Sequence, residues 1–370
     1  AALTTLSQAL ADFSQSPYQE TNANIVMNAF KGVTQVLNEY DANLKTLMEQ
    51  TKNDLSVAVE DINTKLDQLS ELNSSIAHEI FSNNDYDGVN YGPNDLLDQR
   101  NVILDDLSRY GDVQVTDLED GKIQVKINGK VVVDASGASY TNDKLNIGSD
   151  GVTLTWNSNN QNANLGAGAI RGFTDMLTGA DPINAGIPYY QNKMDNFAQT
   201  LADVFNNKIH ADDPDFPDKY KFLLQGGVDG KVTAGNISIS DQWADDVSYI
   251  IRKQNPDGEL DNQDILDMKA AFEQDFNFGG EYTGTFSEFI TSVTNTLGSG
   301  IKTNSARMSA SLAIAESADS ERMGVSGVSL NEEGISMMTY NKAYQALGRL
   351  MTTMDEQLDM IINKMGIVGR

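Results

Sequence analysis

The chain has 370 residues, 40% of them hydrophobic and seven of them proline, which fits a folded protein with room for about two or three domains. Its net charge of −27 argues against a nucleic-acid or anionic-membrane partner, because phosphate backbones and acidic headgroups repel such a surface. Cysteine is absent, which excludes disulfides and thiolate catalysis, and no apolar run approaches the roughly 18 residues of a membrane span. The chain has neither a signal peptide nor an initiator Met, so we expect a fragment or a processed protein.

Residues 21 to about 82 are expected to form helix, because their apolar residues repeat at alternating spacings of three and four. Two seams result. The first is Val33, Leu37, Tyr40, Leu44 and Leu47, and the second is Leu55, Val59, Ile62, Leu66, Leu69, Ile76 and Ile80, with Asn73 at its one polar position. The change of phase between them predicts a short break or local unwinding. We expect the C-terminal half of the chain to cover both seams in an antiparallel bundle.

The loop at 83–88 has the look of a calcium-binding loop, with Asn83, Asp85 and Asp87 at alternate positions. Calcium is disfavoured, because the first ligand would be Asn and Asn94 stands where a bidentate Glu is needed. A short helix is expected to open directly afterwards, at residues 94–100, with Asn94 or Asp95 as its cap.

From Val113 the apolar residues alternate with polar ones, which predicts strands. Asn128-Gly129 is a signal for a tight hairpin turn. We therefore expect a small antiparallel β module over about 113–179, inserted between helical segments and standing outside the bundle.

Helix is expected again at 189–209, followed by a mixed segment at 211–283 and an amphipathic helix at 286–318. The predicted fold is mainly α with an inserted β module: an elongated, multi-domain protein whose long bundle is built from both flanks of the chain. The predicted domains are 1–112 and 181–330 (two halves of the helical bundle), 113–180 (the β domain) and 331–370 (a terminal coiled-coil-like helix).

The last forty residues carry the longest unbroken heptad pattern. Its seam is Met337, Tyr340, Tyr344, Leu347, Met351, Met354, Leu358, Ile361 and Met365. At 1.5 Å per residue this seam extends about 42 Å and needs a partner helix. Residues 301–370 hold seven basic and eight acidic residues, so this near-neutral segment is where like subunits would repel each other least. We predict that the seam meets another chain, because it lies at the C-terminus, where one end of the helix can project; the alternative is a long core helix that packs within its own domain.

No constellation of residues indicates catalysis. The two histidines, His78 and His210, are far apart and lack partners at metal-ligand spacing. Adjacent carboxylates such as Asp212 and Asp213 are expected by chance among 53 acidic residues. We expect no enzyme and predict no catalytic, cofactor-binding or metal-binding residue.

Three stretches together resemble a family of bacterial flagellar axial proteins, that of hook-associated protein 1, which joins hook to filament. They are Asn94–Ser108, Ile187–Tyr190, and the C-terminal block Gly327–Glu333, Tyr340–Ala346 and Met360–Gly366. The first is fairly specific to the family, whereas other hook and rod proteins share the C-terminal block. The β module and residues 211–283 match only loosely.

The resemblance implies a structural adaptor that stacks in a ring-like tubular assembly, with other axial proteins such as the hook protein and the second junction protein as partners. It further implies export by the flagellar type III apparatus to the outside of the cell without a cleavable signal peptide, and an export chaperone that binds residues 340–365. Members of the family begin with a further helical segment that pairs with the C-terminal helix. The resemblance implies that this partner of the seam is missing here.

Two alternatives remain open at this point. The chain could be another axial component, such as a hook or rod protein or the second junction protein, although Asn94–Arg100 counts against that. It could also be an extracellular binding protein or enzyme whose site lies in the module at 113–180, in which case a pocket with converging polar groups is expected there.

Overall fold

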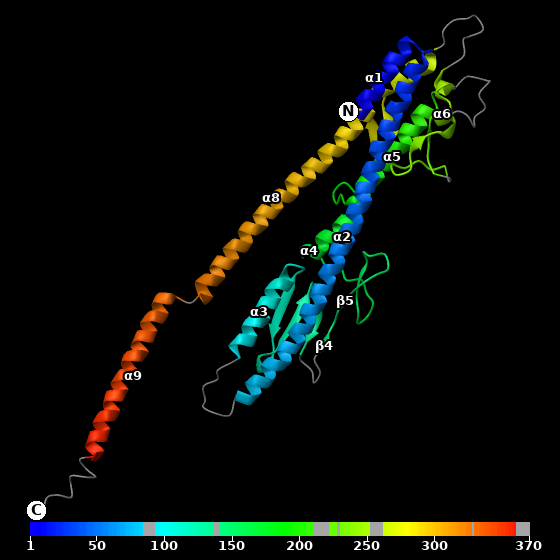
Figure 1. Ribbon diagram of the computed structural model, residues 1–370. Helices are drawn as coiled ribbons and strands as arrows, with labels where there is room; N and C mark the ends of the chain where they lie inside the picture. Colours follow the sequence, from blue (N-terminus) through cyan, green and yellow to red (C-terminus); the bar gives the residue numbers. More distant parts are fainter. Residues whose placement is uncertain are drawn as a thin grey trace, which may run out of the picture. The chain divides into compact units, whose positions relative to one another are not determined.

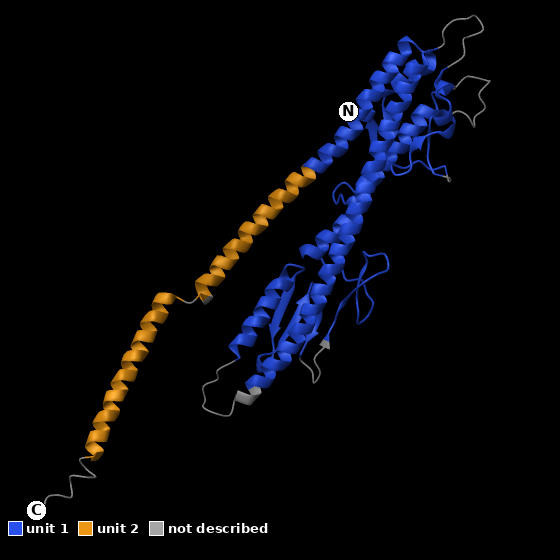
Figure 2. Ribbon diagram, viewed as in Figure 1, with its two compact units in different colours: residues 1–298 blue, residues 299–370 orange. Residues whose placement is uncertain are grey.

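The computed structural model describes residues 1–83, 93–135, 141–209, 222–227, 230–251, 262–327 and 329–359. The chain forms two compact units, residues 1–298 and 299–370 (Figure 2). The units divide inside helix α8 (Phe286–Ser326), whereas the sequence placed the start of the last domain at 331. The four-domain division remains a prediction. Among the described residues, no helix is both long and apolar enough to span a membrane.

Unit 1 is built along one helix, α2, which runs without interruption from Glu20 to Asn83 (Figure 1). Its 64 residues correspond to about 96 Å at 1.5 Å per residue. The helix predicted at 21–82 is confirmed, but the break predicted between Leu47 and Leu55 is wrong. The change of phase instead marks the passage of α2 from one hydrophobic core to another, and between the cores Tyr40 and Leu47 are exposed.

The first core surrounds the N-terminal half of α2. Its aromatic centre includes Phe30, Phe197, Phe205, Phe278 and Trp243, all nearly or completely buried. The elements that supply it, besides α2 and the start of α8, are α1 (Ala2–Gln15), α5 (Ile187–Asn206), β7 (Leu224–Gln225), β8 (Ser238–Ile239), α6 (Asp241–Asp245), η3 (Val247–Ile250), α7 (Gln263–Ala270), η4 (Ala271–Glu273), β9 (Phe276–Phe278) and β10 (Tyr282–Gly284). The helices predicted at 189–209 and from 286 are confirmed.

The second core lies between the C-terminal half of α2 and a β-sheet. The sheet is antiparallel in the order β1-β2-β3-β4, and a two-stranded ladder β5-β6 follows. The bounds are α3 (Asn94–Ser108), β1 (Val113–Asp117), η1 (Glu119–Gly121), β2 (Ile123–Ile127), β3 (Lys130–Asp134), β4 (Thr141–Asn142), β5 (Leu145–Ile147), β6 (Leu154–Trp156) and α4 (Gly168–Thr178). The predicted hairpin turn is confirmed: Asn128 and Gly129 both have positive φ, 48° and 80°, as a type I′ turn requires.

Two sequence-based expectations about this region are wrong. The β module does not stand outside the helices, and within the described part of unit 1 the second seam of α2 packs against the sheet rather than against helices from the C-terminal half. Leu55, Ile62 and Leu66 pack in one cluster with Val125 and Ile127 of the sheet. The reason is that a sheet with one apolar face must bury it, and the α2 seam offers the matching surface.

Two smaller elements also differ from expectation. Helix α4 occupies residues that were assigned to the β module. Helix α3 begins at Asn94 as predicted, but Pro93 is its N-cap and no side chain caps it. Asp95 lies in the first turn, where its negative charge interacts favourably with the helix dipole. The loop considered for calcium falls almost wholly outside the described residues.

Candidate subunit-interaction site

Helix α9 (Leu330–Asp359) carries the predicted seam and exposes it. The described members of the seam are Met337, Tyr340, Tyr344, Leu347, Met351, Met354 and Leu358, whose exposed fractions range from 50% at Leu358 to 79% at Tyr344. Ile361 and Met365 lie outside the described residues. The seam is therefore a row of large apolar side chains that the described residues of unit 2 leave uncovered.

The two faces of α9 differ in chemistry. Lys342, Arg349 and Glu356 follow one another at a spacing of seven and lie on the face opposite the seam. Glu332 and Glu333 in the first turn suit the helix dipole, and the Glu332 amide donates to Ser329 Oγ at 3.4 Å. The charged row suits water and the seam suits a partner, but the separation is incomplete, because Ile335 and Met338 expose apolar side chains on the charged face as well.

Sequence reasoning missed a second set of exposed apolar residues, in the part of α8 that belongs to unit 2. Ile301, Met308, Leu312 and Met323 are each more than half exposed. The signal was present in the spacing of four between Met308 and Leu312. These residues enlarge the apolar surface of unit 2 beyond the predicted seam.

An exposed apolar row of this kind is suited to association with another surface. Burying one large apolar side chain is worth about 1.5–3 kcal/mol, so a seam of this kind can drive helix pairing. Methionine is flexible and adapts to irregular partner surfaces. Within the described residues no group of His, Asp or Glu is arranged to hold a metal ion, and His78 lies exposed on α2; His210 is outside the described residues.

The stretch Asn94–Arg100 has a structural role in unit 1. Arg100 is buried, and its Nη1 donates to the carbonyl of Gly121 at 2.6 Å. Burial lowers the pKa of the Arg100 guanidinium, while the nearby Asp117 carboxylate opposes that shift. Arg100 thereby ties α3 to the connection between β1 and β2.

The stretch Ile187–Tyr190 opens α5, with Pro188 in its first turn. Tyr189 and Tyr190 pack edge to face, with ring centroids 5.1 Å apart. Lys193 lies 5.2 Å above the Tyr189 ring and forms an ion pair of 2.5 Å with Glu281. Burial raises the pKa of Tyr190. These contacts join the start of α5 to the β9-β10 hairpin.

Two asparagines on α2 make the hydrogen bonds that a neighbouring β-strand would make. Asn73 on α2 donates to the Ile123 carbonyl at 2.9 Å and accepts from the Ile123 amide at 3.1 Å. Asn63 makes the same pair of bonds to Leu145, at 2.9 and 2.8 Å. Strand β3 pairs with β2 only at residues 125–127, so Asn73 supplies the bonds that a longer β3 would have given Ile123.

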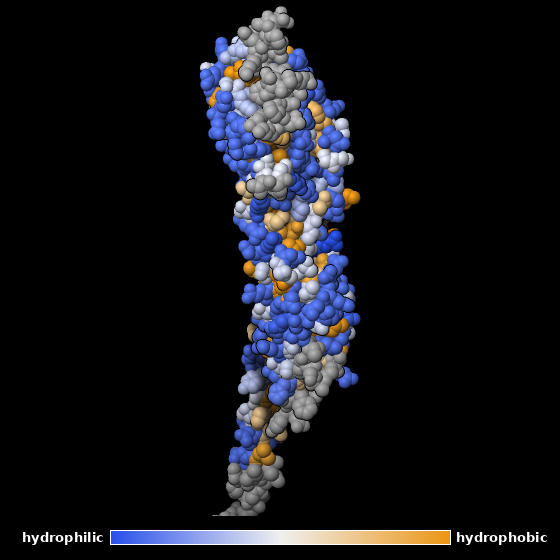
Figure 3. Space-filling model, turned by 90° about the vertical axis from the view of Figure 1, so that its right-hand side faces the viewer, coloured by the Kyte–Doolittle hydropathy of each residue, from blue (hydrophilic) through white to orange (hydrophobic). Residues whose placement is uncertain are grey.

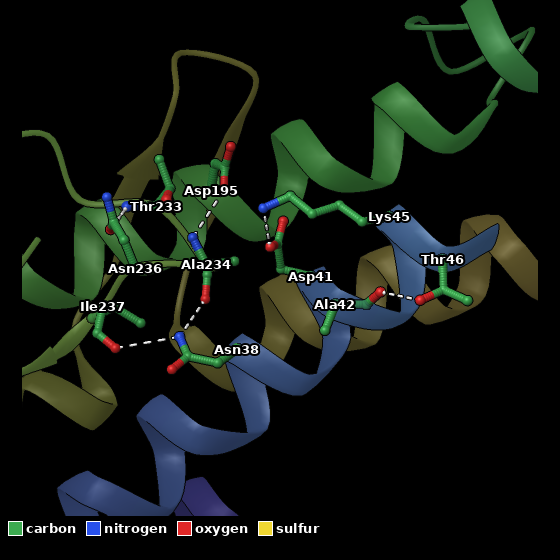
Figure 4. A network of polar contacts seen from close by, with 10 residues as sticks. All are labelled: Asn38, Asp41, Ala42, Lys45, Thr46, Asp195, Thr233, Ala234, Asn236 and Ile237. Atoms are coloured by element: carbon green, nitrogen blue, oxygen red, sulfur yellow. Dashed lines mark hydrogen bonds and ion pairs between the residues drawn. The ribbon is translucent and has the colours of Figure 1, made fainter. Parts of the chain in front are cut away.

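A related network ties the first core together (Figure 4). Asn38 Nδ2 donates to the carbonyls of Ala234 and Ile237, at 2.7 and 3.3 Å. Asp195 on α5 accepts from the Ala234 amide at 2.8 Å. Gly235 approaches Asp41 so closely that a Cβ there would collide with its carboxylate. Hydrogen bonds from both α2 and α5 thus fix the loop that contains Ala234 and Ile237.

Surface hollows occur both beside the β module and within it. One, of about 610 Å³, lies between α2 and α3 and includes Glu71, Asp98 and Val102. The other, of about 430 Å³, lies between α4 and the β5-β6 region and includes Asn162 and Asp175. On the face shown in Figure 3, hydrophilic residues predominate and hydrophobic residues occur in small groups.

Two known protein families match this chain. Residues 1–218 match the family described as "Flagellar hook-associated protein FlgK helical domain", and residues 320–364 match "Flagellar basal body rod FlgEFG protein C-terminal". Both are families of structural proteins of the bacterial flagellum. The first match covers more than half of the chain, so the chain belongs to the FlgK family of flagellar hook-associated proteins. The resemblance drawn from Asn94–Ser108, Ile187–Tyr190 and the C-terminal block is confirmed.

Individual relatives are similar as well. Flagellar hook-associated protein 1 of Bacillus subtilis is 25% identical over 397 aligned residues, which cover 98% of this chain and 75% of that protein. The solved structure of the flagellar hook junction protein FlgK from Burkholderia pseudomallei is 20% identical, with a TM-score of 0.44, and the match covers 56% of this chain and 37% of that one.

Proposed function

We propose that this chain is a structural adaptor of the bacterial flagellum that joins hook to filament by subunit stacking in a tubular assembly. The observation that carries the proposal is the exposed seam of α9 in a chain of the FlgK family. A seam of this size in water is unfavourable, and a subunit contact removes it from water.

The mechanism is geometric rather than catalytic. The seam of α9 supplies the contact along the inner part of the assembly, and unit 1 supplies a body for lateral stacking. The near-neutral charge of residues 301–370, against −26 on the rest, keeps repulsion lowest where packing is closest. Arg100 and the asparagine bonds stiffen unit 1, which suits a part that transmits load and carries out no chemistry.

The proposed partners are other copies of this chain and other flagellar axial proteins, namely the hook protein and the second junction protein. The match of residues 320–364 to a rod-protein family supports a shared mode of axial packing. Before assembly, an export chaperone is proposed to cover residues 340–365, and the assembled protein is proposed to lie outside the cell.

The test is genetic. Residues 331–370 are deleted in the native host, cells are imaged by electron microscopy, and the medium is assayed for flagellin. Bare hooks and flagellin in the medium support the proposal, and normal filaments contradict it.

A point variant sharpens the test. Tyr344→Asp places a charge on the seam, whereas the control Lys342→Asp makes a larger change of charge on the opposite face of α9. We expect filament loss with the first variant only. If both variants fail equally, net charge rather than the seam decides assembly, and the proposed role of the seam is wrong.

A further inference from the structure

Strand β1 is the long open edge of the sheet in unit 1. The sheet order β1-β2-β3-β4 leaves β1 paired on one side only, and four of its five residues are exposed. The Asn128 amide donates to the Asp112 carbonyl at 2.8 Å, and the Leu118 amide donates to the Lys122 carbonyl at 2.9 Å. Because such bonds alternate along an antiparallel pair, even-numbered residues face β2.

The backbone groups of Val113, Val115 and Asp117 therefore point to the open edge. Within the described chain, no hydrogen bond reaches these groups from outside the ladder. Proteins usually blunt such an edge with lysine, proline or a bulge. Strand β1 contains neither residue, and the bulge of this sheet lies between β2 and β3 instead, at Val125 and Lys126. The edge is ready for another strand.

The side chains indicate which strand fits. Val133, Val125 and Val115 are in register across three strands. The first two are completely buried, whereas Val115 is 45% exposed. The apolar row thus ends at an open side, and a further valine at the same level would continue it.

We propose that β1 pairs antiparallel with β1 of a second copy of this chain, with Val115 on the twofold axis. The partner's Val115 then continues the valine row. In this register Gln114 lies opposite the partner's Thr116, and Val113 lies opposite the partner's Asp117. No like charges are directly opposed, although the chain carries −27. The strand is complementary to itself, as a twofold contact requires.

This pairing is distinct from the stacking proposed above. A twofold contact closes on itself and does not propagate into a tube. It covers an edge that would otherwise recruit other strands, and it belongs to the chain before assembly. A chain whose seam has been removed is expected to pair in the same way.

The absence of cysteine makes a register-specific test possible. Val115→Cys is prepared in the full chain, checked by circular dichroism and oxidised mildly at micromolar concentration. Directly opposed, hydrogen-bonded residues have Cα atoms about 5.5 Å apart, within disulfide range. In Thr116→Cys, the matched control one residue along, the two cysteines are a diagonal pair whose Cα atoms lie about 7–8 Å apart, which is beyond that range.

A mixture gives a second readout at exposed positions. Gln114→Cys and Thr116→Cys are each expected to cross-link poorly alone, but to form a heterodimer when mixed. We expect Val115→Cys to form disulfide dimer about tenfold faster than Thr116→Cys, because opposed thiols have a high effective concentration. Equal rates for the two variants, or no heterodimer in the mixture, would overturn the proposal. Pairing of β1 with a different protein would give the same negative result and is also a refutation.

Discussion

Asn73 gives the sharpest test of how the sheet is held on α2. A heptad interpretation treats this residue as a polar defect in an apolar seam, and Asn73→Leu would then stabilise the chain. In the structure Asn73 is completely buried and makes both hydrogen bonds to Ile123. Replacement by leucine leaves the amide and the carbonyl of Ile123 without partners.

The magnitude follows from these contacts. Each buried backbone group left unsatisfied costs about 1–3 kcal/mol. Burial of the leucine side chain returns about 1.5–3 kcal/mol. We expect a net loss of about 2 kcal/mol in the free energy of unfolding of the second core. Asn63→Leu is the control, because Asn63 is only partly buried, water can reach Leu145, and the expected loss is below about 1 kcal/mol.

The two tryptophans make the assay specific. Trp156 belongs to the second core and Trp243 to the first. In a Trp243→Phe background, fluorescence during guanidinium unfolding reports on the second core alone. If Asn73→Leu unfolds at the same or a higher denaturant concentration, the strand-mimicking role of Asn73 is refuted.

Three further predictions concern separate features. Gly129→Ala should cost about 1–2 kcal/mol by denaturant unfolding because its φ is 80°, whereas Gly172→Ala, in α4 with open space around it, should stabilise by about 0.5–1 kcal/mol; equal effects would contradict this. Hydrogen bonds from the Thr153 side chain and the Thr153 and Val152 backbone amides lower the pKa of Asp150 to about 2. The stabilisation of the fold by the ionised Asp150 carboxylate is therefore complete above the ordinary pKa of 3.8 and is lost as pH falls toward 2. Asp150→Asn should weaken this loss of stability in acid, measured by denaturant unfolding at a series of pH values. The same dependence of stability on pH in the variant and the parent chain would refute the role of Asp150. Tyr344→Asp should leave thermal unfolding of the isolated chain within about 0.5 kcal/mol, since Tyr344 is 79% exposed; a larger loss would mean that Tyr344 is packed within the chain.

The long helices were predictable because their signal is local. A spacing of three and four along the chain is enough to define α2 and α9 as helices with one apolar face. It does not say what covers that face. The second seam of α2 was assigned to a helical partner, yet a sheet covers it, since any apolar surface of the right shape satisfies the same pattern.

Other features had no usable local signal. Helix α4 contains Gly168 and Gly172, which lower its helix propensity. Its residues were therefore assigned to the β module. The role of Asn73 depends on Ile123, fifty residues further along the chain. For the interaction site, the spacing predicted which residues of α9 share a face, but only the structure describes that face as exposed.

The central claim is that the seam of α9 is exposed in the free chain and buried in the assembled flagellum. The most direct measurement compares thiol labelling of Met351→Cys, on the seam, with Arg349→Cys, on the opposite face, in the isolated protein and in purified flagella. Both cysteines are expected to react in the isolated chain, and only Met351→Cys is expected to become protected on assembly. Equal labelling of the two positions in assembled flagella would contradict it.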